Sequence, residues 1–236
     1  MDTKRLFITA GCNGAGKSTF SKRMLPADMK HIPVFDGDVF YVQKIRELFA
    51  LTGNQAAPIT ISREAAAYVS DLFTERYQKA IGKGAPFAFE GHFTERGQWM
   101  PLLDFKNAGY QLEMDYLGLK NVDLSLNRVK ERVRKGGHSV EPRNVAHNYY
   151  SNAANVSSNH ALFDRLTVWD TSRLKPVQLV RIEEGKVIAA LPTAKQPQWL
   201  QEEMPAIYQQ VEAFHRQAQE QKPPPPDHRR RPSKRL

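Results

Sequence analysis

The nine residues GCNGAGKST, at positions 11–19, constrain the fold of this chain more than any other feature. They satisfy the pattern Gly-x-x-x-x-Gly-Lys-Ser, with the apolar run RLFITA before them and the helix-compatible FSKRML after them. Glycines in such a strand–loop–helix unit let consecutive backbone N–H groups surround phosphate oxygens at the positive end of the helix. The segment therefore predicts a site for a nucleoside triphosphate.

Each side chain of this loop has an expected role. Lys17 is expected to reach the β- and γ-phosphates of ATP, and the Ser18 hydroxyl to coordinate Mg²⁺. The remaining positions expected to contact the phosphates are Asn13, Gly14, Ala15, Gly16 and Thr19. The sequence thus predicts ATP and Mg²⁺ as cofactors.

Apolar strands alternate with amphipathic helices along the chain, which favours an α/β fold of the P-loop kinase type. We expect a doubly wound, mostly parallel sheet flanked by helices, with a C-terminal hairpin and helix. The expected strands are 5–10, 31–36, 86–90, 110–119 and 164–170, and the hairpin is 176–191 with its turn at Glu184–Gly185. The expected helices are 17–25, 39–49, 62–84 with Ser62 as N-cap, 95–108, 121–137, 141–156 and 199–219.

Composition indicates one large domain over residues 1–221. The 236 residues are 41% hydrophobic and 25% charged, which is ordinary for a globular enzyme. No apolar run approaches the roughly 20 residues that cross a bilayer, and one cysteine excludes an internal disulfide framework. We expect a cytoplasmic protein without a membrane partner.

The segment 222–236, KPPPPDHRRRPSKRL, departs from this composition. Its six Lys and Arg residues and one Asp account for five of the nine net positive charges of the chain. Its prolines oppose a helix and it offers almost nothing to bury, so we expect a disordered tail. It is either a solvated end without a specific role or a basic arm for nucleic acid or an acidic partner.

Acidic residues follow the second expected strand, in VFDGDVF at 34–40. In a doubly wound sheet this strand end is expected beside the phosphate loop, within reach of an acceptor hydroxyl. We assign Asp38 as the base that accepts the hydroxyl proton, and Asp36 as a cap or a group that orients the substrate. The alternative is that both residues only cap the following helix.

An arginine-rich helix, in LNRVKERVRKGGHSV, is the expected lid over residues 128–142. Arg128 and Arg132 are four residues apart and share one helical face, where their guanidinium groups can close over phosphates. Two glycines then provide a hinge before His138, a candidate substrate contact. The alternative is a solvated basic face.

A third strand end, in FAFEGHF, carries Glu90 and His92. Glu90 is a candidate for binding substrate hydroxyls or water-mediated Mg²⁺, or a helix cap. His92 is either structural or a further substrate contact.

Features of other P-loop proteins are missing from the sequence. An Asn-Lys-x-Asp guanine reader does not occur, and PFAFE is a weak match to the apolar-then-acidic strand of motor ATPases. A small-molecule kinase, which needs an acid near the acceptor and mobile arginines, fits better.

The ordered motifs GCNGAGKSTF, DGDVF, FAFE, LSLNRVKERVRKGGHSV, NYYSNAANV and LTVWDTS resemble the zeta toxin family over roughly residues 5–190. The resemblance implies transfer of the ATP γ-phosphate to a hydroxyl of a nucleotide sugar, which is UDP-N-acetylglucosamine in the best-known toxins. By matching position it implies that Lys17 and Ser18 bind phosphate and Mg²⁺, that Asp38 is the base, and that Arg128 and Arg132 bind phosphates. It also implies an antitoxin as a candidate partner.

The chain departs from the family at the acceptor side. Family members commonly read Glu-Thr-Thr where this chain has Glu90, Gly91 and His92. The departure concerns sugar specificity more than kinase activity. The sequence leaves two further readings open: a nucleoside or polynucleotide kinase that uses the basic tail, and a nucleotide-binding toxin module held inert by an antitoxin.

Overall fold

The computed structural model describes residues 4–52, 57–137 and 139–221. The 222–236 tail and His138 therefore lie outside the described residues, and the expectations placed on them stay predictions. Within the described part of the chain, no helix is both long enough and apolar enough to cross a membrane.

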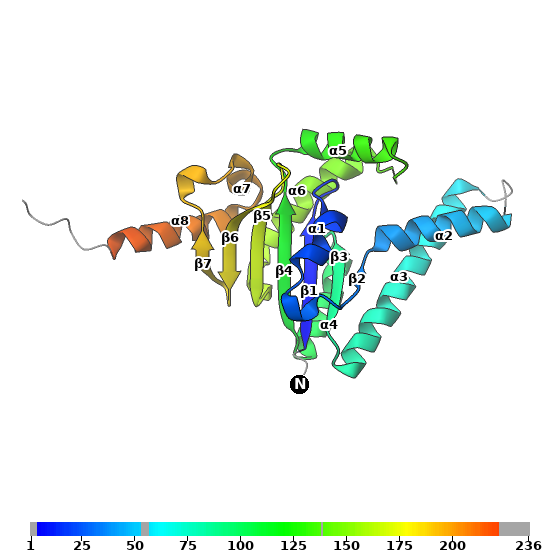
Figure 1. The fold of residues 1–236 in the computed structure, drawn as a ribbon, viewed down its shortest axis with the longest axis horizontal. Helices are drawn as coiled ribbons and strands as arrows, with labels where there is room; N and C mark the ends of the chain where they lie inside the picture. The colour runs from blue at the N-terminus through cyan, green and yellow to red at the C-terminus, as the bar shows by residue number, and fades with distance from the viewer. Residues whose placement is uncertain (1–3, 53–56, 138, 222–236) are drawn as a thin grey trace, which may run out of the picture.

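A seven-stranded sheet in the order β2-β3-β1-β4-β5-β6-β7 forms the centre of the described fold (Figure 1). The first five strands in this order pair in parallel, whereas β6 pairs antiparallel with both β5 and β7. The strands are β1 (Arg5–Gly11), β2 (Val34–Phe35), β3 (Phe87–Gly91), β4 (Gln111–Gly118), β5 (Arg165–Asp170), β6 (Val177–Glu183) and β7 (Lys186–Ala190). The predicted mostly parallel α/β sheet is confirmed.

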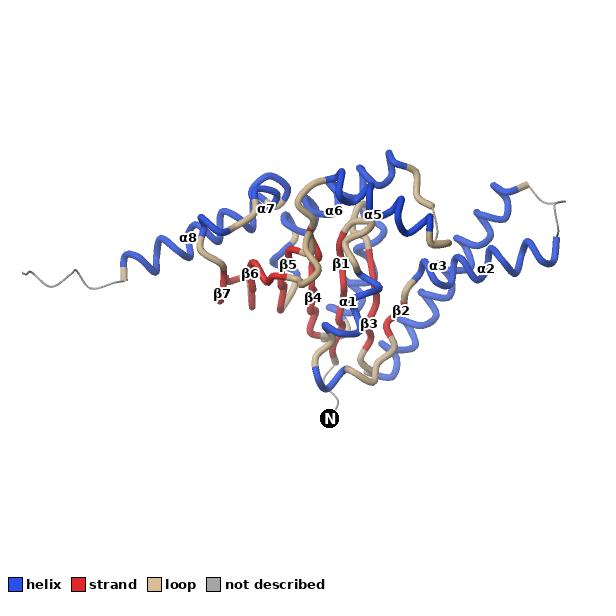
Figure 2. The backbone as a smooth tube through the Cα atoms, turned by 45° about the horizontal axis from the view of Figure 1, so that its top comes forward, coloured by secondary structure: helices blue, strands red, loops and turns tan. Residues whose placement is uncertain are grey.

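Helices cover both faces of the sheet, as Figure 2 shows. In Figure 1, α1 lies in front of the sheet, α6 behind it and α5 across its upper edge, while α2 and α3 extend away as a helical pair. The helices are α1 (Lys17–Met24), α2 (Gly37–Thr52), α3 (Pro58–Lys83), α4 (Met100–Asn107), α5 (Val122–Arg134), α6 (Pro142–Ser158), α7 (Gln198–Glu203) and α8 (Pro205–Glu220). A 3₁₀ turn, η3 (Arg96–Trp99), precedes α4.

The core follows from strands that are apolar along most of their length. Six of the seven residues of β1 are buried, and so are seven of the eight residues of β4. Aromatic side chains of β3 and α3 pack beside them, with Phe73 and Phe89 5.2 Å apart between ring centroids. Buried central strands of this kind fix the sheet edge at which parallel strands end, and the phosphate loop leaves β1 at that edge.

Two expected helix boundaries are wrong. Ser62 does not cap α3, because the helix already begins at Pro58. Proline is favourable at this first position, since the backbone N–H that it lacks would have no partner within the helix. The hydroxyl of Ser62 lies instead 2.6 Å from that of Tyr41 on α2. The expected helix 199–219 is broken at Met204, whose backbone is not helical (φ −128°, ψ +55°) and which precedes Pro205. Proline cannot donate to the helix before it and disfavours a helical residue in front of it.

The hairpin turn is confirmed at Glu184–Gly185. These two residues have φ of +49° and +74°, which is the left-handed pair that a tight two-residue hairpin requires. The turn joins β6 to β7 and extends the sheet on the side away from the phosphate loop.

A buried carboxylate on β4 predicts a pH dependence of stability. Asp115 is 2% exposed, and burial raises its pKa to about 6 although Arg165 Nη1 lies 3.5 Å away. The folded chain therefore binds a proton more readily than the unfolded chain between about pH 4 and pH 6, and the contribution of Asp115 to stability falls as the pH rises through this window.

We expect Asp115→Asn to remove this penalty. Relative to the wild type, the unfolding free energy of the variant should improve by up to about 3 kcal/mol between pH 4 and pH 7. Urea unfolding of both proteins at several pH values measures the difference between their unfolding free energies. The titration of all other groups is common to both proteins and cancels in this difference. A difference that does not change with pH would contradict the assignment.

Candidate active site

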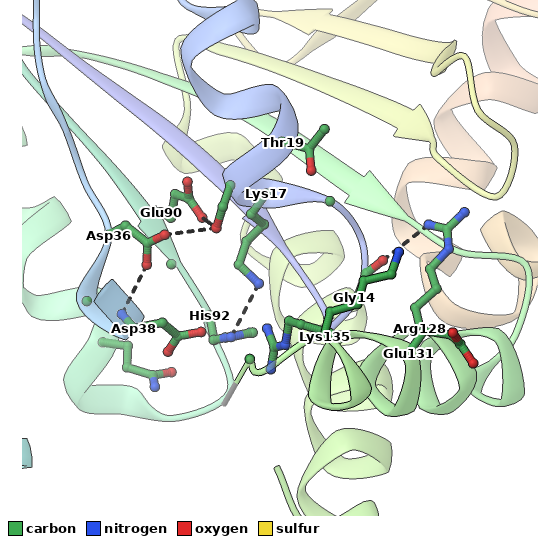
Figure 3. A pocket seen from close by; sticks show the side chains of 17 residues that line it. Gly14, Lys17, Thr19, Asp36, Asp38, Glu90, His92, Arg128, Glu131 and Lys135 are labelled. Atoms are coloured by element: carbon green, nitrogen blue, oxygen red, sulfur yellow. Dashed lines mark hydrogen bonds between the residues drawn. The ribbon is translucent and has the colours of Figure 1, made fainter. Parts of the chain in front are cut away.

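A cavity of about 610 Å³ opens where the parallel strands of the sheet end (Figure 3). It collects side chains from the phosphate loop, from the ends of β2 and β3, and from α5. The residues that line it are Gly14, Gly16, Lys17, Ser18, Thr19, Asp36, Gly37, Asp38, Glu90, Gly91, His92, Gln98, Arg128, Glu131, Arg132, Lys135 and Gly137. The sequence-predicted residues Asn13 and Ala15 are buried beneath this lining.

The phosphate loop has the backbone conformation that its glycines allow. Gly14 and Gly16 have φ of +75° and +93°, and Gly16 occupies the N-cap of α1. L-residues rarely adopt this region, so these two glycines are required by geometry. The first N–H groups of α1 thus face the cavity at the positive end of the helix, as an anion site requires.

Lys17 lies folded against its own loop. Its ammonium donates to the carbonyl oxygens of Gly11, at 2.9 Å, and Cys12, at 3.2 Å. The third neighbour is His92, whose Nε2 lies 3.3 Å from Lys17 Nζ (Figure 3). Burial lowers the pKa of Lys17, against the opposing pull of Cys12 and the carboxylates of Asp38 and Glu90.

His92 belongs to this donor half of the site. Burial lowers its pKa well below the usual value, and the positive charges of Lys17 and Arg132 lower it further. The imidazole is therefore neutral at physiological pH and can accept from Lys17 through Nε2, with its own proton on Nδ1. The structure places His92 against the phosphate-loop lysine, which is a more specific position than the sequence indicated.

Ser18 lies between two carboxylates. Its Oγ is 2.8 Å from Asp36 Oδ2 and 2.9 Å from Glu90 Oε2, while Ser21 Oγ donates to the other oxygen of Glu90 at 2.8 Å. The pKa of Glu90 is raised by burial and by the negative charge of Asp36. A hydroxyl beside two carboxylates is a set of hard oxygen donors, which fits Mg²⁺. In the described part of the chain, no group of three or more His, Cys, Asp or Glu residues could hold a metal ion.

Asp36 and Asp38 divide the roles that the sequence left open. Asp36 precedes α2 and accepts from the backbone N–H of Asp38 at 3.0 Å, so it caps the helix as well as facing Ser18. Asp38 lies exposed in the first turn of α2 and lines the cavity. The end of β2 lies beside the phosphate loop as expected, since Asp36 contacts Ser18, although β3 lies between β2 and β1 in the sheet.

The two arginines of the predicted lid face the cavity from α5 but differ in their contacts. The guanidinium of Arg128 donates to three carbonyl oxygens, those of Gly14 at 3.2 Å, Thr171 at 2.9 Å and Ser172 at 3.0 Å. Arg128 therefore ties α5 to the phosphate loop and to the loop after β5. Arg132 lines the cavity one turn further along α5.

Gly137, the second glycine after α5, packs closely against Arg132. A Cβ at Gly137 would lie 2.6 Å from Cγ of Arg132, so a side chain there would displace the arginine. The backbone N–H of Gly137 also donates to the carbonyl oxygen of Arg132 at 2.9 Å. The second glycine thus allows the chain to turn back over α5 beside Arg132.

Replacement of Arg128 tests whether it holds the loop. We expect Arg128→Ala to lower the unfolding free energy by about 2–3 kcal/mol, since three carbonyl oxygens lose a charged donor, and to weaken ATP binding. Arg128→Lys should recover only part of the loss, because an ammonium lacks the planar fork that reaches separated acceptors. Chemical unfolding and ATP titration measure both effects.

Arg134→Ala is the control, since Arg134 forms an exposed pair with Glu131 on the same helix at 2.5 Å. It should change stability by less than about 0.5 kcal/mol. Arg128→Ala with full stability and lost turnover would instead give Arg128 a role in phosphate binding alone.

Several residues that hold the loop were not predicted as site residues. Ser125 Oγ donates to Asn13 O at 2.5 Å, and Asn148 Nδ2 donates to Asn13 Oδ1 at 2.8 Å. Thr171 Oγ1 lies 2.8 Å from the carbonyl oxygen of Ala15. All three residues fall in the motifs quoted above: Ser125 in LSLNRVKERVRKGGHSV, Asn148 in NYYSNAANV and Thr171 in LTVWDTS. The motifs were therefore the available signal. Of the unpredicted cavity residues, Glu131 and Lys135 also fall in LSLNRVKERVRKGGHSV, whereas Gln98 falls in none of the motifs.

The strand order and the phosphate loop at the end of β1 define a P-loop fold of the kinase type. A family model described as Zeta toxin matches residues 2–181. The chain therefore belongs to the zeta toxin family.

The chain is also similar to a curated protein and to solved structures. An uncharacterised protein of Haemophilus influenzae (strain Rd) is 25% identical over 149 residues, which are 63% of this chain and 94% of the relative. A chain of the AvrRxo1-ORF1:AvrRxo1-ORF2 complex with sulphate ions has a TM-score of 0.62 at 16% identity, covering 86% of this chain. This chain spans 63% of the length of that one.

A third likeness is to a chain of the PezAT chromosomal toxin–antitoxin system of Streptococcus pneumoniae. The TM-score is 0.54 at 16% identity, over 93% of this chain and 86% of that one. At this identity the two structural likenesses establish a shared fold.

Proposed function

We propose that the chain is an ATP-dependent kinase that transfers the γ-phosphate to a hydroxyl of a nucleotide sugar or a related metabolite. The observation that carries the proposal is that one cavity contains both Lys17 of the phosphate loop and Asp38 of α2. A phosphate donor site and a base for an acceptor hydroxyl thus open into the same space, as phosphoryl transfer requires.

The donor half would work through the loop and α5. The loop N–H groups and Lys17 would bind the phosphates, with Lys17 leaving its carbonyl partners for them. Arg132 would add positive charge from α5. Ser18, Asp36 and Glu90 would hold Mg²⁺, directly or through water. When bound there, Mg²⁺ supplies positive charge that offsets the charge of the phosphates.

ATP as the donor has support from a structural likeness. A chain of the AvrRxo1-ORF1:ORF2 complex crystallised with ATP has a TM-score of 0.61 at 16% identity, covering 80% of this chain and 60% of that one. That complex was thus solved with the nucleotide that the proposed reaction requires.

The acceptor half would begin at Asp38, which would take the proton of the attacking hydroxyl. UDP-N-acetylglucosamine is the first acceptor to test, because the chain belongs to the zeta toxin family. Family members commonly have a threonine at the position of His92, and an imidazole does not provide the hydroxyl of that threonine. Its contact with Lys17 gives it a role on the donor side, so a different sugar or a different hydroxyl remains an open outcome.

One experiment identifies the acceptor directly. The chain is incubated with ATP, Mg²⁺ and a pool of metabolites that contains UDP-N-acetylglucosamine, nucleosides and oligonucleotides. Mass spectrometry then detects which compound gains one phosphate. A nucleotide sugar that gains phosphate supports the proposal, whereas transfer only to nucleosides or oligonucleotides supports the second kinase reading. No phosphorylated product from the pool would overturn both.

A protein partner is supported by the likeness to PezAT, which is a toxin–antitoxin system. We propose that an antitoxin-like partner, where one exists, would block the cavity. The isolated chain should then bind ATP, and the complex should not. Equal ATP binding by both would contradict this mode of inhibition.

A role of the 222–236 tail in nucleic acid binding also stays a proposal. Deletion of these residues should raise the KM for an oligonucleotide acceptor and leave that for free nucleosides unchanged. Equal values for the full and shortened chains would leave the tail without this role.

A further inference from the structure

Gln98 is a residue of the cavity that neither the motifs nor the proposed reaction assigns. It lies in η3, on the connection that leaves β3, the strand that carries Glu90. The phosphate loop belongs to β1 and the arginines belong to α5. Gln98 therefore reaches the cavity from the connection after β3, and not from the phosphate loop or from the arginine helix.

The oxygen of the Gln98 amide is fully engaged. Oε1 accepts from the backbone N–H of Thr94 at 2.7 Å and of Glu95 at 3.0 Å, and from Thr94 Oγ1 at 3.3 Å. The Glu95 side chain accepts in return from the backbone of Gln98, which completes a capping box. Since two backbone donors require an acceptor at this position, the oxygen and nitrogen of the amide cannot be exchanged.

The amide nitrogen is consequently the group that Gln98 offers to a ligand. Nε2 carries two hydrogens and cannot accept a hydrogen bond, so it can only donate. The rigid capping box fixes its position before any substrate binds. A preorganised donor of this kind selects for an oxygen atom at one place.

The charges around the cavity indicate which kind of oxygen it would meet. In Figure 3, Asp36, Asp38 and Glu90 lie together on one side, with Arg128 and Lys135 on the other. A phosphate placed against Gln98 would keep its charge without an offset there, because the amide is neutral, whereas Lys17, Arg132 and Mg²⁺ would offset the charge of the ATP phosphates. A hydroxyl or carbonyl oxygen carries no such cost.

We propose that Gln98 is a specificity-determining residue whose Nε2 donates a hydrogen bond to a neutral oxygen of the acceptor, a sugar hydroxyl or an amide carbonyl near the hydroxyl that is phosphorylated. The proposal rests on the proposed kinase function. It adds a substrate contact outside the phosphate loop, the arginine helix and the DGDVF segment.

Gln98→Glu separates the contact from the fold of the turn. A carboxylate at position 98 still accepts from the two backbone N–H groups, so the capping box is kept, but it has no hydrogen to donate. Steady-state kinetics with UDP-N-acetylglucosamine as the probe should show kcat/KM for the acceptor reduced by about 2- to 12-fold, the loss of one hydrogen bond. The KM for ATP and the melting temperature should stay unchanged.

Gln98→Glu both removes a hydrogen-bond donor and adds a negative charge, and two controls separate these effects on acceptor kinetics. Arg96→Gln lowers the charge of the same turn by one unit, as Gln98→Glu does, at an exposed residue that does not line the cavity, and should leave acceptor kinetics unchanged. Repeating the Gln98→Glu assay in about 0.5 M salt screens repulsion between charges, whereas a missing hydrogen bond persists.

The outcomes distinguish this proposal from the function on which it rests. If UDP-N-acetylglucosamine is not phosphorylated by the wild type, the assay uses the compound of the metabolite pool that is. When no compound is phosphorylated, the kinase function fails and the Gln98 contact falls with it. When the wild type is active and Gln98→Glu changes acceptor kcat/KM less than 2-fold, or the loss vanishes in salt, only the Gln98 contact is overturned.

Discussion

Asp38→Asn is expected to reduce phosphoryl transfer by roughly 10²- to 10⁴-fold, the range of a lost general base. Asparagine keeps the size and shape of the side chain but cannot take the hydroxyl proton. The cap of α2 should survive, because it is the Asp36 carboxylate that accepts from the backbone of residue 38. ATP binding should therefore be retained while turnover with the acceptor is lost.

Asp123→Asn is the matched control. Asp123 lies in the first turn of α5, as Asp38 lies in the first turn of α2, and both are exposed. Both substitutions remove an interaction with the helix dipole worth about 0.3–1 kcal/mol, but only Asp38 lines the cavity. Asp123→Asn should keep full activity. Turnover unchanged in Asp38→Asn would remove Asp38 as the base.

Lys17→Met is expected to lower turnover by roughly 10²- to 10³-fold, as the loss of one charged donor to a transition state does. Its ammonium is held by two carbonyl oxygens of the loop, a position from which it can turn toward bound phosphates. Because burial already lowers its pKa, the ammonium contributes little to folding. Relief of the buried charge is opposed by the hydrogen bonds that the carbonyl oxygens of Gly11 and Cys12 lose, so the melting temperature of Lys17→Met should stay close to that of the wild type.

Lys135→Met tests whether any lysine of the cavity would give the same result. Lys135 lines the cavity from the end of α5 and is exposed. Its removal should change turnover by less than about 10-fold, since screening weakens an exposed charge. Equal losses in the two variants would mean that Lys17 acts only through the overall charge of the cavity.

The sequence predicted those parts of the site that depend on neighbours in the chain. The loop glycines and the Glu184–Gly185 turn require φ values that few other residues adopt, so their positions in the sequence indicate their conformation. The helix expected over 121–137 begins at Val122, and the side chain of Asn121 caps it by accepting from Leu124 N at 3.0 Å. Local chemistry decides each of these features.

Predictions failed where distant parts of the chain compete with local preference. Ser62 is a good N-cap residue, but Pro58 begins the helix a turn earlier and Ser62 packs against Tyr41. The helix that carries the arginines was predicted and is present as α5, yet nothing in its spacing shows that Arg128 donates to carbonyl oxygens of two other loops. Helical periodicity identifies a face and does not say what lies opposite it.

The sequence by itself determined that this chain has a P-loop after a buried strand, in a mostly parallel α/β fold, because the required backbone is encoded within nine consecutive residues. Only the tertiary structure decided how the site is assembled. It inserts β3 between β1 and β2, which brings Glu90 and Asp36 to Ser18. It also fixes the amide of Gln98 in the cavity. The physical reason is that these contacts join segments far apart in the chain, whose meeting depends on the packing of the whole sheet.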